Sequence, residues 1–131
     1  MTVVPGIPKC PRAAYSNATF GAQQITSHVI LVNVSGEIDL FSAPEFGNCV
    51  RRTAGDVGRL IIDMTRVEFF GTAGLDVLRA VNDERANAGR SWAMICGRPV
   101  QRLLHAAGLD SAFPCYSSVE GALGSWKIRI A

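Results

Sequence analysis

Residues 59–81, RLIIDMTRVEFFGTAGLDVLRAV, decide the fold class of this chain. A short apolar run that ends at a carboxylate predicts a buried strand over residues 60–63. Residues 64–71 are expected to form a turn. Apolar residues then recur at helical spacing and predict an amphipathic helix over residues 72–88, which Gly89 ends. The sequence therefore indicates a strand, a loop and a helix, with a hydroxyl residue, Thr72, where the helix starts.

Strands and helices alternate through the rest of the chain as well. Further strands are predicted at 18–24, as an edge strand, and at 29–34, 91–96 and 112–116. Further helices are predicted to begin at the capping boxes 42–45 and 117–120 and at Pro99. This order predicts an α/β fold: a small, mainly parallel β-sheet with about four helices packed around it. Residues 1–17 are rich in proline and predict a flexible N-terminal arm, so a single domain is expected over 18–131.

The overall composition argues against several classes of protein. Of the 131 residues, 48% are hydrophobic and 18% are charged, which is typical of a globular domain. The 13 basic and 11 acidic residues leave a net charge of +2, and the basic residues are scattered, so nucleic acid is not an expected partner. No apolar run is long enough to span a membrane, and the first residues lack the apolar core of a secretory signal. The sequence therefore favours a cytoplasmic protein without a membrane partner.

Patterns typical of catalysis or metal binding are lacking. The four cysteines are well separated and form no C-x-x-C pair, and neither a phosphate-binding glycine motif nor a nucleophile elbow occurs. We therefore expect no enzymatic activity, metal or cofactor. Cys96 and Cys115 both follow or lie in predicted strands. Two states stay open for them: free thiols, which a reducing cytosol favours, or a regulatory disulfide.

Three short motifs follow one another along the chain. Residues 36–39, GEID, come at the end of an early strand. Residues 63–75, DMTRVEFFGTAGL, combine a carboxylate, an aromatic pair and a hydroxyl-bearing helix start. Residues 99–109, PVQRLLHAAGL, form a predicted helix with a closing Gly-Leu step. Taken together, these motifs resemble the signature of the STAS domain family, the anti-sigma factor antagonists and their relatives, over about residues 19–123.

The resemblance implies a binding protein that acts by partner switching. Such a protein sequesters an anti-sigma factor, which is itself a serine/threonine kinase, and thereby frees a sigma factor for transcription. The resemblance also implies that the kinase phosphorylates Thr72, the first hydroxyl of the motif. A phosphate adds roughly −2 charge, which the interface would not accommodate. The alternative for Thr72 is a purely structural role as the N-cap of its helix.

Two residues depart from the family pattern beside Thr72. Gly71 stands where the family has an aspartate, and Ala73 stands where it has a second hydroxyl. The aspartate would orient the acceptor hydroxyl or help to hold the nucleotide-bound kinase. Its loss predicts slower phosphorylation, a different choice of kinase, or a protein that stays permanently competent to bind.

The surface expected to bind the partner combines a strand end, a loop and one side of a helix. For Asp39 the alternative is an ordinary carboxylate at a helix entry, and for the helix side it is a solvated surface with a local ion pair. Asp63 is expected to fix the loop by accepting backbone N–H bonds. Of Phe69 and Phe70, one ring is expected in the core and the other at the surface. The expected partner-binding residues are Glu37, Asp39, Phe69, Phe70, Gly71, Ala73, Leu75, Asp76 and Arg79.

Two other functions stay open. A STAS-like accessory subunit of a transport or signalling assembly would use the same surface constitutively, which Gly71 and Ala73 favour. The second is an anti-sigma factor antagonist whose binding to its partner is controlled by oxidation of its cysteines.

Overall fold

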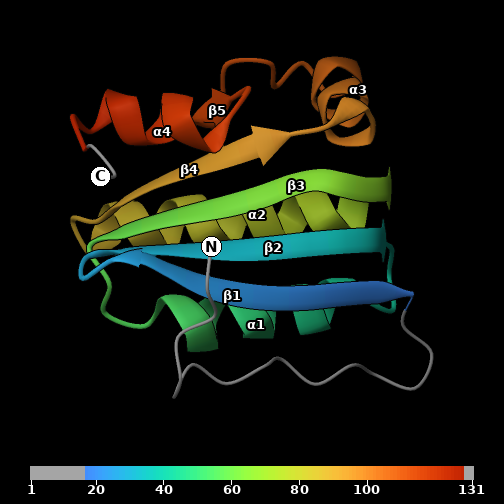
Figure 1. Ribbon diagram of the computed structural model, residues 1–131. Coiled ribbons are helices and arrows are strands. Elements are labelled where there is room, and N and C mark those ends of the chain that lie inside the picture. Colours follow the sequence, from blue (N-terminus) through green and yellow to red (C-terminus); the bar gives the residue numbers. More distant parts are fainter. Residues whose placement is uncertain (1–16, 129–131) are drawn as a thin grey trace.

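Five strands form one sheet in the computed structural model, which describes residues 17–128. Their order across the sheet follows the sequence, and all neighbours pair in parallel except the first two, which are antiparallel (Figure 1). The predicted edge strand is therefore at an edge, and the mainly parallel sheet is confirmed. The flexible arm predicted at 1–17 lies outside the described residues, apart from Asn17. The strands are β1 (Ala18–Thr26), β2 (Val29–Ile38), β3 (Arg59–Phe70), β4 (Ser91–Cys96) and β5 (Cys115–Tyr116).

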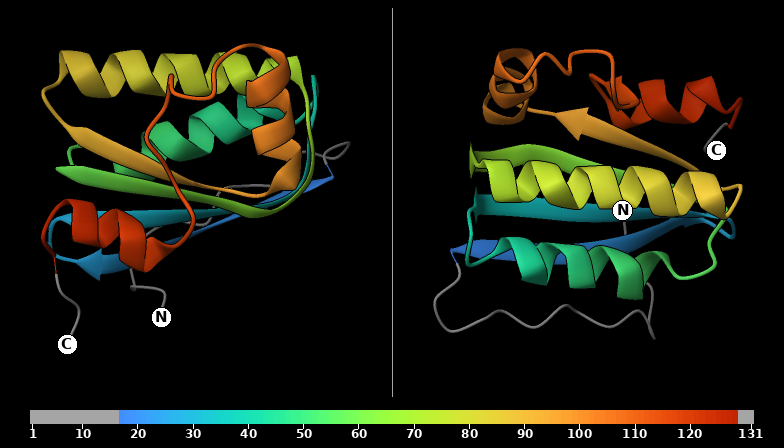
Figure 2. Two further views of the ribbon diagram at one scale, coloured as in Figure 1. Left: turned by 90° about the horizontal axis from the view of Figure 1, so that it is seen from above. Right: turned by 180° about the vertical axis from the view of Figure 1, so that it is seen from behind.

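Four helices cover the sheet, as the sequence predicts. The first three pack on one face over a core that includes Phe46, Leu78 and Val100, and the fourth packs on the other face, where Ala122 and Leu123 meet Ile61 and Ile95. Figure 2 shows α1 and α2 on one side of the sheet and α4 on the opposite side. No helix within residues 17–128 has the length and apolar character needed to cross a bilayer. The helices are α1 (Ala43–Ala54), α2 (Thr72–Asn87), α3 (Arg98–Ala106) and α4 (Val119–Ser125).

The main difference from the sequence prediction is the length of β3. The strand does not end at Asp63, and the turn expected over residues 64–71 is wrong, because β3 continues to Phe70. Beyond Asp63 the buried residues are Met64, Val67 and Phe70, at a spacing of three. The pairing with β2 slips twice in this region, which lets every third residue turn inward. A regular strand buries every second residue. The buried apolar residues of this segment recur every third residue instead, so the sequence alone gave no strand signal here.

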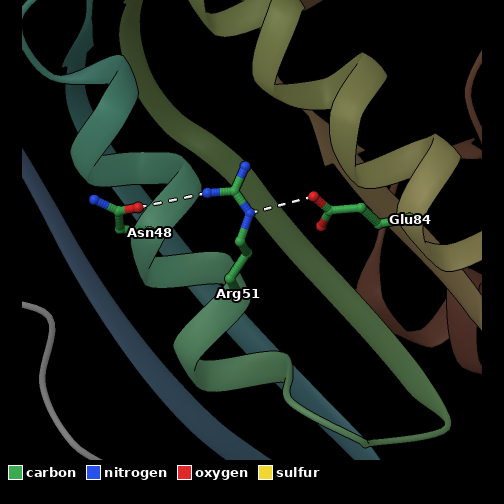
Figure 3. Close-up of polar contacts among 3 residues, drawn as sticks. All are labelled: Asn48, Arg51 and Glu84. Atoms are coloured by element: carbon green, nitrogen blue, oxygen red, sulfur yellow. Dashed lines mark hydrogen bonds and ion pairs between the residues drawn. The ribbon is translucent and has the colours of Figure 1, made fainter.

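Helices α1 and α2 lie side by side and are joined at the surface by Arg51. Its Nε donates to Glu84 Oε1 across 3.2 Å, and its Nη1 donates to Asn48 Oδ1 across 3.5 Å (Figure 3). About half of each charged side chain is exposed, 55% for Arg51 and 52% for Glu84. An ion pair so exposed contributes at most about 1 kcal/mol. The buried residues between the helices and the sheet therefore hold the domain together.

Candidate functional site

The carboxyl ends of β2 and β3 meet at one edge of the sheet, at the right of Figure 1. Ile38 pairs with Phe70, and the N–H of Gly71 donates to the carbonyl of Ile38 across 2.9 Å. Residues 39–42 connect β2 to α1, and Gly71 alone connects β3 to α2. This parallel arrangement therefore places residues 37–41 beside residues 69–73. We name these two segments together the carboxyl edge.

Thr72 is exposed at the carboxyl edge. It is the first residue of α2, and the extended Gly71 before it is the N-cap. The alternative that Thr72 itself caps the helix is wrong, because no side chain caps this end of α2. Within residues 17–128, the Thr72 hydroxyl makes no hydrogen bond. It is thus an accessible alcohol beside backbone N–H groups of the first turn, which lack intrahelical partners, at the positive end of the helix dipole.

Three large apolar side chains are exposed at the same edge. Phe69 is 51% exposed whereas Phe70 is 4% exposed, which confirms that one ring is in the core and the other at the surface. Leu40 and Phe41, in the connection from β2 to α1, are 76% and 69% exposed. Exposed apolar residues that cluster, rather than scatter singly, mark an interaction site. The carboxyl edge therefore presents an apolar surface immediately beside Thr72.

Sequence reasoning missed Leu40 and Phe41. Neither residue belongs to the strand pattern before it or to the helix pattern after it. Their place in the chain could have identified them. They are two adjacent large apolar residues in the four-residue connection, 39–42, between a strand and a helix. A connection this short has no core of its own in which to bury them.

Asp39 holds the segment that carries Leu40 and Phe41. Its Oδ1 accepts hydrogen bonds from the N–H groups of Phe41 and Ser42, both across 2.9 Å. The buried Ser42 hydroxyl accepts from the N–H of Asp39 and donates to the carbonyl of Glu37 across 2.7 Å. The capping box predicted at 42–45 is therefore not formed, because this hydroxyl is used within the turn instead of on the helix. Asp39 thus shapes the carboxyl edge.

The same hydrogen bonds predict how this turn responds to pH. The backbone hydrogen bond from Ser42 is the largest influence on the Asp39 carboxyl and holds its pKa below the ordinary value of 3.8. A group whose pKa falls on folding stabilises the fold above its unfolded pKa, and that contribution is lost as the pH falls through the lowered pKa. In a pH titration followed by NMR, we expect the Phe41 and Ser42 amide signals to move with a midpoint below 3.8. The control is Asp39→Asn, in which this movement should be absent; a midpoint above 3.8 would contradict the assignment.

The other predicted partner-binding residues divide into two groups. Asp76 and Arg79 are exposed on α2, on the same side as Thr72, as expected. The prediction that Leu75 lies on this outer side is wrong, since Leu75 is only 6% exposed and packs in the core. Its burial follows from the close approach of the first turn of α2 to the sheet at Gly74. Glu37 is half-buried and accepts a hydrogen bond from Asn17 across 3.1 Å.

Two further predicted residues have defined surroundings. Ala73 is half-buried and packs against the core. Asp63 Oδ1 accepts from the N–H of Thr65 across 3.0 Å, which confirms that it bonds backbone, although within a strand and not a loop. Beside Phe69, a groove of about 340 Å³ runs between the end of β3 and α3, with Arg102 and Leu103 on its far side. In the described part of the chain, no three His, Cys, Asp or Glu residues gather as metal ligands.

The two candidate redox cysteines lie together at a different place in the fold. Cys96 is buried at the end of β4, and Cys115 is exposed at the start of β5. Both are free thiols, and their sulfur atoms are 3.2 Å apart. The sequence indicated each cysteine as a candidate but did not predict the contact between them, which the structure shows.

Comparison with known proteins gives a consistent set of similarities. The family model of the STAS domain matches residues 22–122. The anti-sigma-F factor antagonist RsfB of Mycobacterium tuberculosis is 30% identical over 96 residues, which cover 72% of this chain and 79% of that protein. A crystal structure of an anti-sigma factor antagonist from Mycobacterium paratuberculosis gives a TM-score of 0.75 at 30% identity, covering 87% of this chain and 97% of that one. The phosphorylated form of SpoIIAA from Bacillus is similar in fold, with a TM-score of 0.64 at 18% identity over 83% of this chain and 100% of that one.

Proposed function

This chain belongs to the STAS domain family, and from that premise we propose that it is an anti-sigma factor antagonist. It binds an anti-sigma factor of the serine/threonine kinase type and thereby frees a sigma factor. The binding needs no cofactor and no catalytic step by this chain. The named function of the similar mycobacterial proteins supports this proposal.

One observation carries the proposal on this chain itself: the exposed apolar group Leu40, Phe41 and Phe69 beside the exposed Thr72. Burying such side chains against a partner releases free energy at about 25 cal/mol for each Å² of apolar surface removed from water. Phenylalanine is enriched at protein interfaces, so Phe41 and Phe69 are the expected anchors. The exposed charges of Asp76 and Arg79 on α2 suit the polar rim that surrounds such anchors.

Phosphorylation of Thr72 is the proposed off switch. A phosphate at the start of α2 is stabilised by the free N–H groups and the helix dipole, so the modified protein remains folded. The same phosphate brings roughly −2 charge and its hydration shell into the centre of an apolar contact. Docking would then have to desolvate that charge without a partner for it, so the anti-sigma factor is released.

The test of this function removes one exposed aromatic side chain and measures binding to the anti-sigma factor. We expect Phe41→Ala to weaken binding to the cognate anti-sigma factor by about 10-fold or more, the size expected for an aromatic anchor. Binding would be measured by calorimetry against each anti-sigma kinase of the source organism. The matched control is Glu120→Ala on α4, an exposed residue on the opposite face of the sheet, which should bind as the parent does. Equal binding by both variants would contradict the proposed interface, and no binding to any anti-sigma kinase would contradict the function.

A second candidate is a constitutive accessory subunit of a transport or signalling assembly. Gly71 and Ala73 favour it, because the chain lacks the aspartate and the second hydroxyl that the family places around the acceptor. Incubation with the anti-sigma kinases and ATP, followed by mass spectrometry, separates the two functions. Added phosphate on Thr72 supports the switched antagonist. Binding of a kinase without added phosphate on Thr72 supports a protein that uses this surface constitutively.

A further inference from the structure

The sulfur atoms of Cys96 and Cys115 are in hydrogen-bond contact between the neighbouring strands β4 and β5. Strands β4 and β5 run parallel with Met94 opposite Cys115, and Cys96 is two residues further along β4. Both side chains turn to the same side of the sheet, and their Sγ atoms are 3.2 Å apart. Cys96 is 8% exposed and Cys115 is exposed, so the pair has one buried and one accessible thiol.

The two thiols differ in acidity because they share a hydrogen bond. The S–H of Cys96 donates to the sulfur of Cys115, which lowers the pKa of Cys115 below its ordinary value. The same hydrogen bond, together with burial, raises the pKa of Cys96. Of the two, Cys115 therefore loses its proton more readily to give the thiolate, which is the reactive form, and Cys96 keeps its proton more firmly.

Small molecules can reach Cys115 from solvent. It lines a hollow of about 580 Å³ beside α3, which is open on one side. The charged and titratable side chains around this hollow are Arg98, Arg102, His105 and Asp110. Asp110 bonds His105 across 3.1 Å, which leaves the two arginines as the cations without a short-range carboxylate contact among the described residues. The hollow therefore gives small molecules a route to Cys115, whose pKa is lowered by the hydrogen bond from Cys96.

We propose that Cys96 and Cys115 form a peroxide-sensitive thiol pair, in which Cys115 reacts first and Cys96 resolves it as a disulfide. The Cys115 thiolate attacks one oxygen of a hydroperoxide, the O–O bond breaks, and the departing oxygen takes up a proton. This leaves a sulfenic acid on Cys115. Cys96 then loses its proton and attacks the Cys115 sulfur; the S–O bond breaks and water leaves. The two sulfurs each lose one electron, and the peroxide gains two.

The fold can accommodate the short movement that this step requires. The sulfurs must come from 3.2 Å to about 2.05 Å. Strand β5 has only two residues and follows the turns of residues 109–114, so Cys115 is held by few backbone bonds. Cys96, in contrast, ends a strand whose last five residues are all buried. We therefore expect Cys115 to move towards Cys96. This chemistry does not depend on which partner the carboxyl edge binds.

The test follows the two sulfurs separately. The full-length reduced protein is exposed to hydrogen peroxide and digested with trypsin without reduction. Trypsin places the two cysteines in different peptides, 91–102 and 103–127, because the Arg98–Pro99 bond resists cleavage. The expected product is a cross-link between these peptides that a thiol reductant reverses. No cross-link at a peroxide dose that oxidises the protein's thiols would overturn the proposal.

Variants distinguish the roles of the two cysteines. In Cys96→Ser, dimedone should trap a sulfenic acid on Cys115, whereas in Cys115→Ser the buried Cys96 should stay reduced under the same exposure. The matched control is Cys115→Ser with Ser117→Cys, which moves the exposed thiol two residues along the chain. It should give at least about 10-fold less cross-link to Cys96. Trapping at Cys96 instead of Cys115, or equal cross-linking in the control, would contradict the assigned roles.

Discussion

Thr72→Glu is expected to weaken binding to the cognate anti-sigma factor by about 30-fold or more, while Thr72→Ala binds as the parent does. The reason is the position of the hydroxyl, exposed at the start of α2 and beside Phe69. A carboxylate there would be buried against the partner without a counter-charge, at a cost of about 2–5 kcal/mol. The hydroxyl itself makes no hydrogen bond within residues 17–128, so its removal costs the folded chain little.

The control for charge alone is Ala86→Glu. Ala86 is exposed near the other end of α2, so this variant adds the same charge to the same helix away from the carboxyl edge. It should bind as the parent does. Calorimetry on the four proteins gives the dissociation constants, and circular dichroism checks that each is folded. Parental binding by Thr72→Glu would contradict the role of Thr72 as a switch.

Gly74→Ala is expected to destabilise the domain by up to about 2 kcal/mol, although alanine is the better helix former. A Cβ on Gly74 would lie 2.6 Å from Cε1 of Phe70 and 2.8 Å from Cγ2 of Ile38, both of which are buried. Overpacking of this kind costs about 1–3 kcal/mol, and alanine returns about 1 kcal/mol of helix propensity. Because these contacts set the first turn of α2 on the sheet, the variant should also move Thr72.

Gly47→Ala on α1 is the matched control, for which the expected change in stability has the opposite sign. A Cβ there would lie 3.7 Å from Val77 Cγ1, an ordinary contact, so only the helix propensity changes. This variant should be more stable than the parent by up to about 1 kcal/mol. Urea unfolding measures both changes as shifts of the midpoint. Shifts in the same direction would contradict the close packing at Gly74.

Much of the fold can be predicted from local hydrophobic patterns in the sequence. The β-branched run of β2 and the apolar run of β4 predict their strands, and the apolar stripe after Thr72 predicts α2. What the patterns could not predict is the second half of β3. Its buried residues recur every third position because the strand is bulged, and a bulge depends on pairing with β2 and not on local propensity.

The candidate site was predictable only in part, for a related reason. Thr72 and the Phe69–Phe70 pair have local signals, and their exposure agrees with the structure. Leu75 was placed on the wrong side because helical spacing does not say how closely a helix approaches the sheet, which Gly74 determines. The contact between Cys96 and Cys115 depends on the pairing of β4 with β5, two strands separated by a whole helix.

The most direct measurement of the central claim is an NMR map of the surface that the anti-sigma factor covers. The claim is that the partner docks on the carboxyl edge, with Leu40, Phe41 and Phe69 buried around Thr72. Adding the unlabelled anti-sigma factor to the isotope-labelled chain should shift or broaden amide signals of residues 37–41 and 69–73, and leave those of α4 unchanged. Perturbations concentrated on α4 and the opposite face of the sheet, with the carboxyl edge unaffected, would contradict the account.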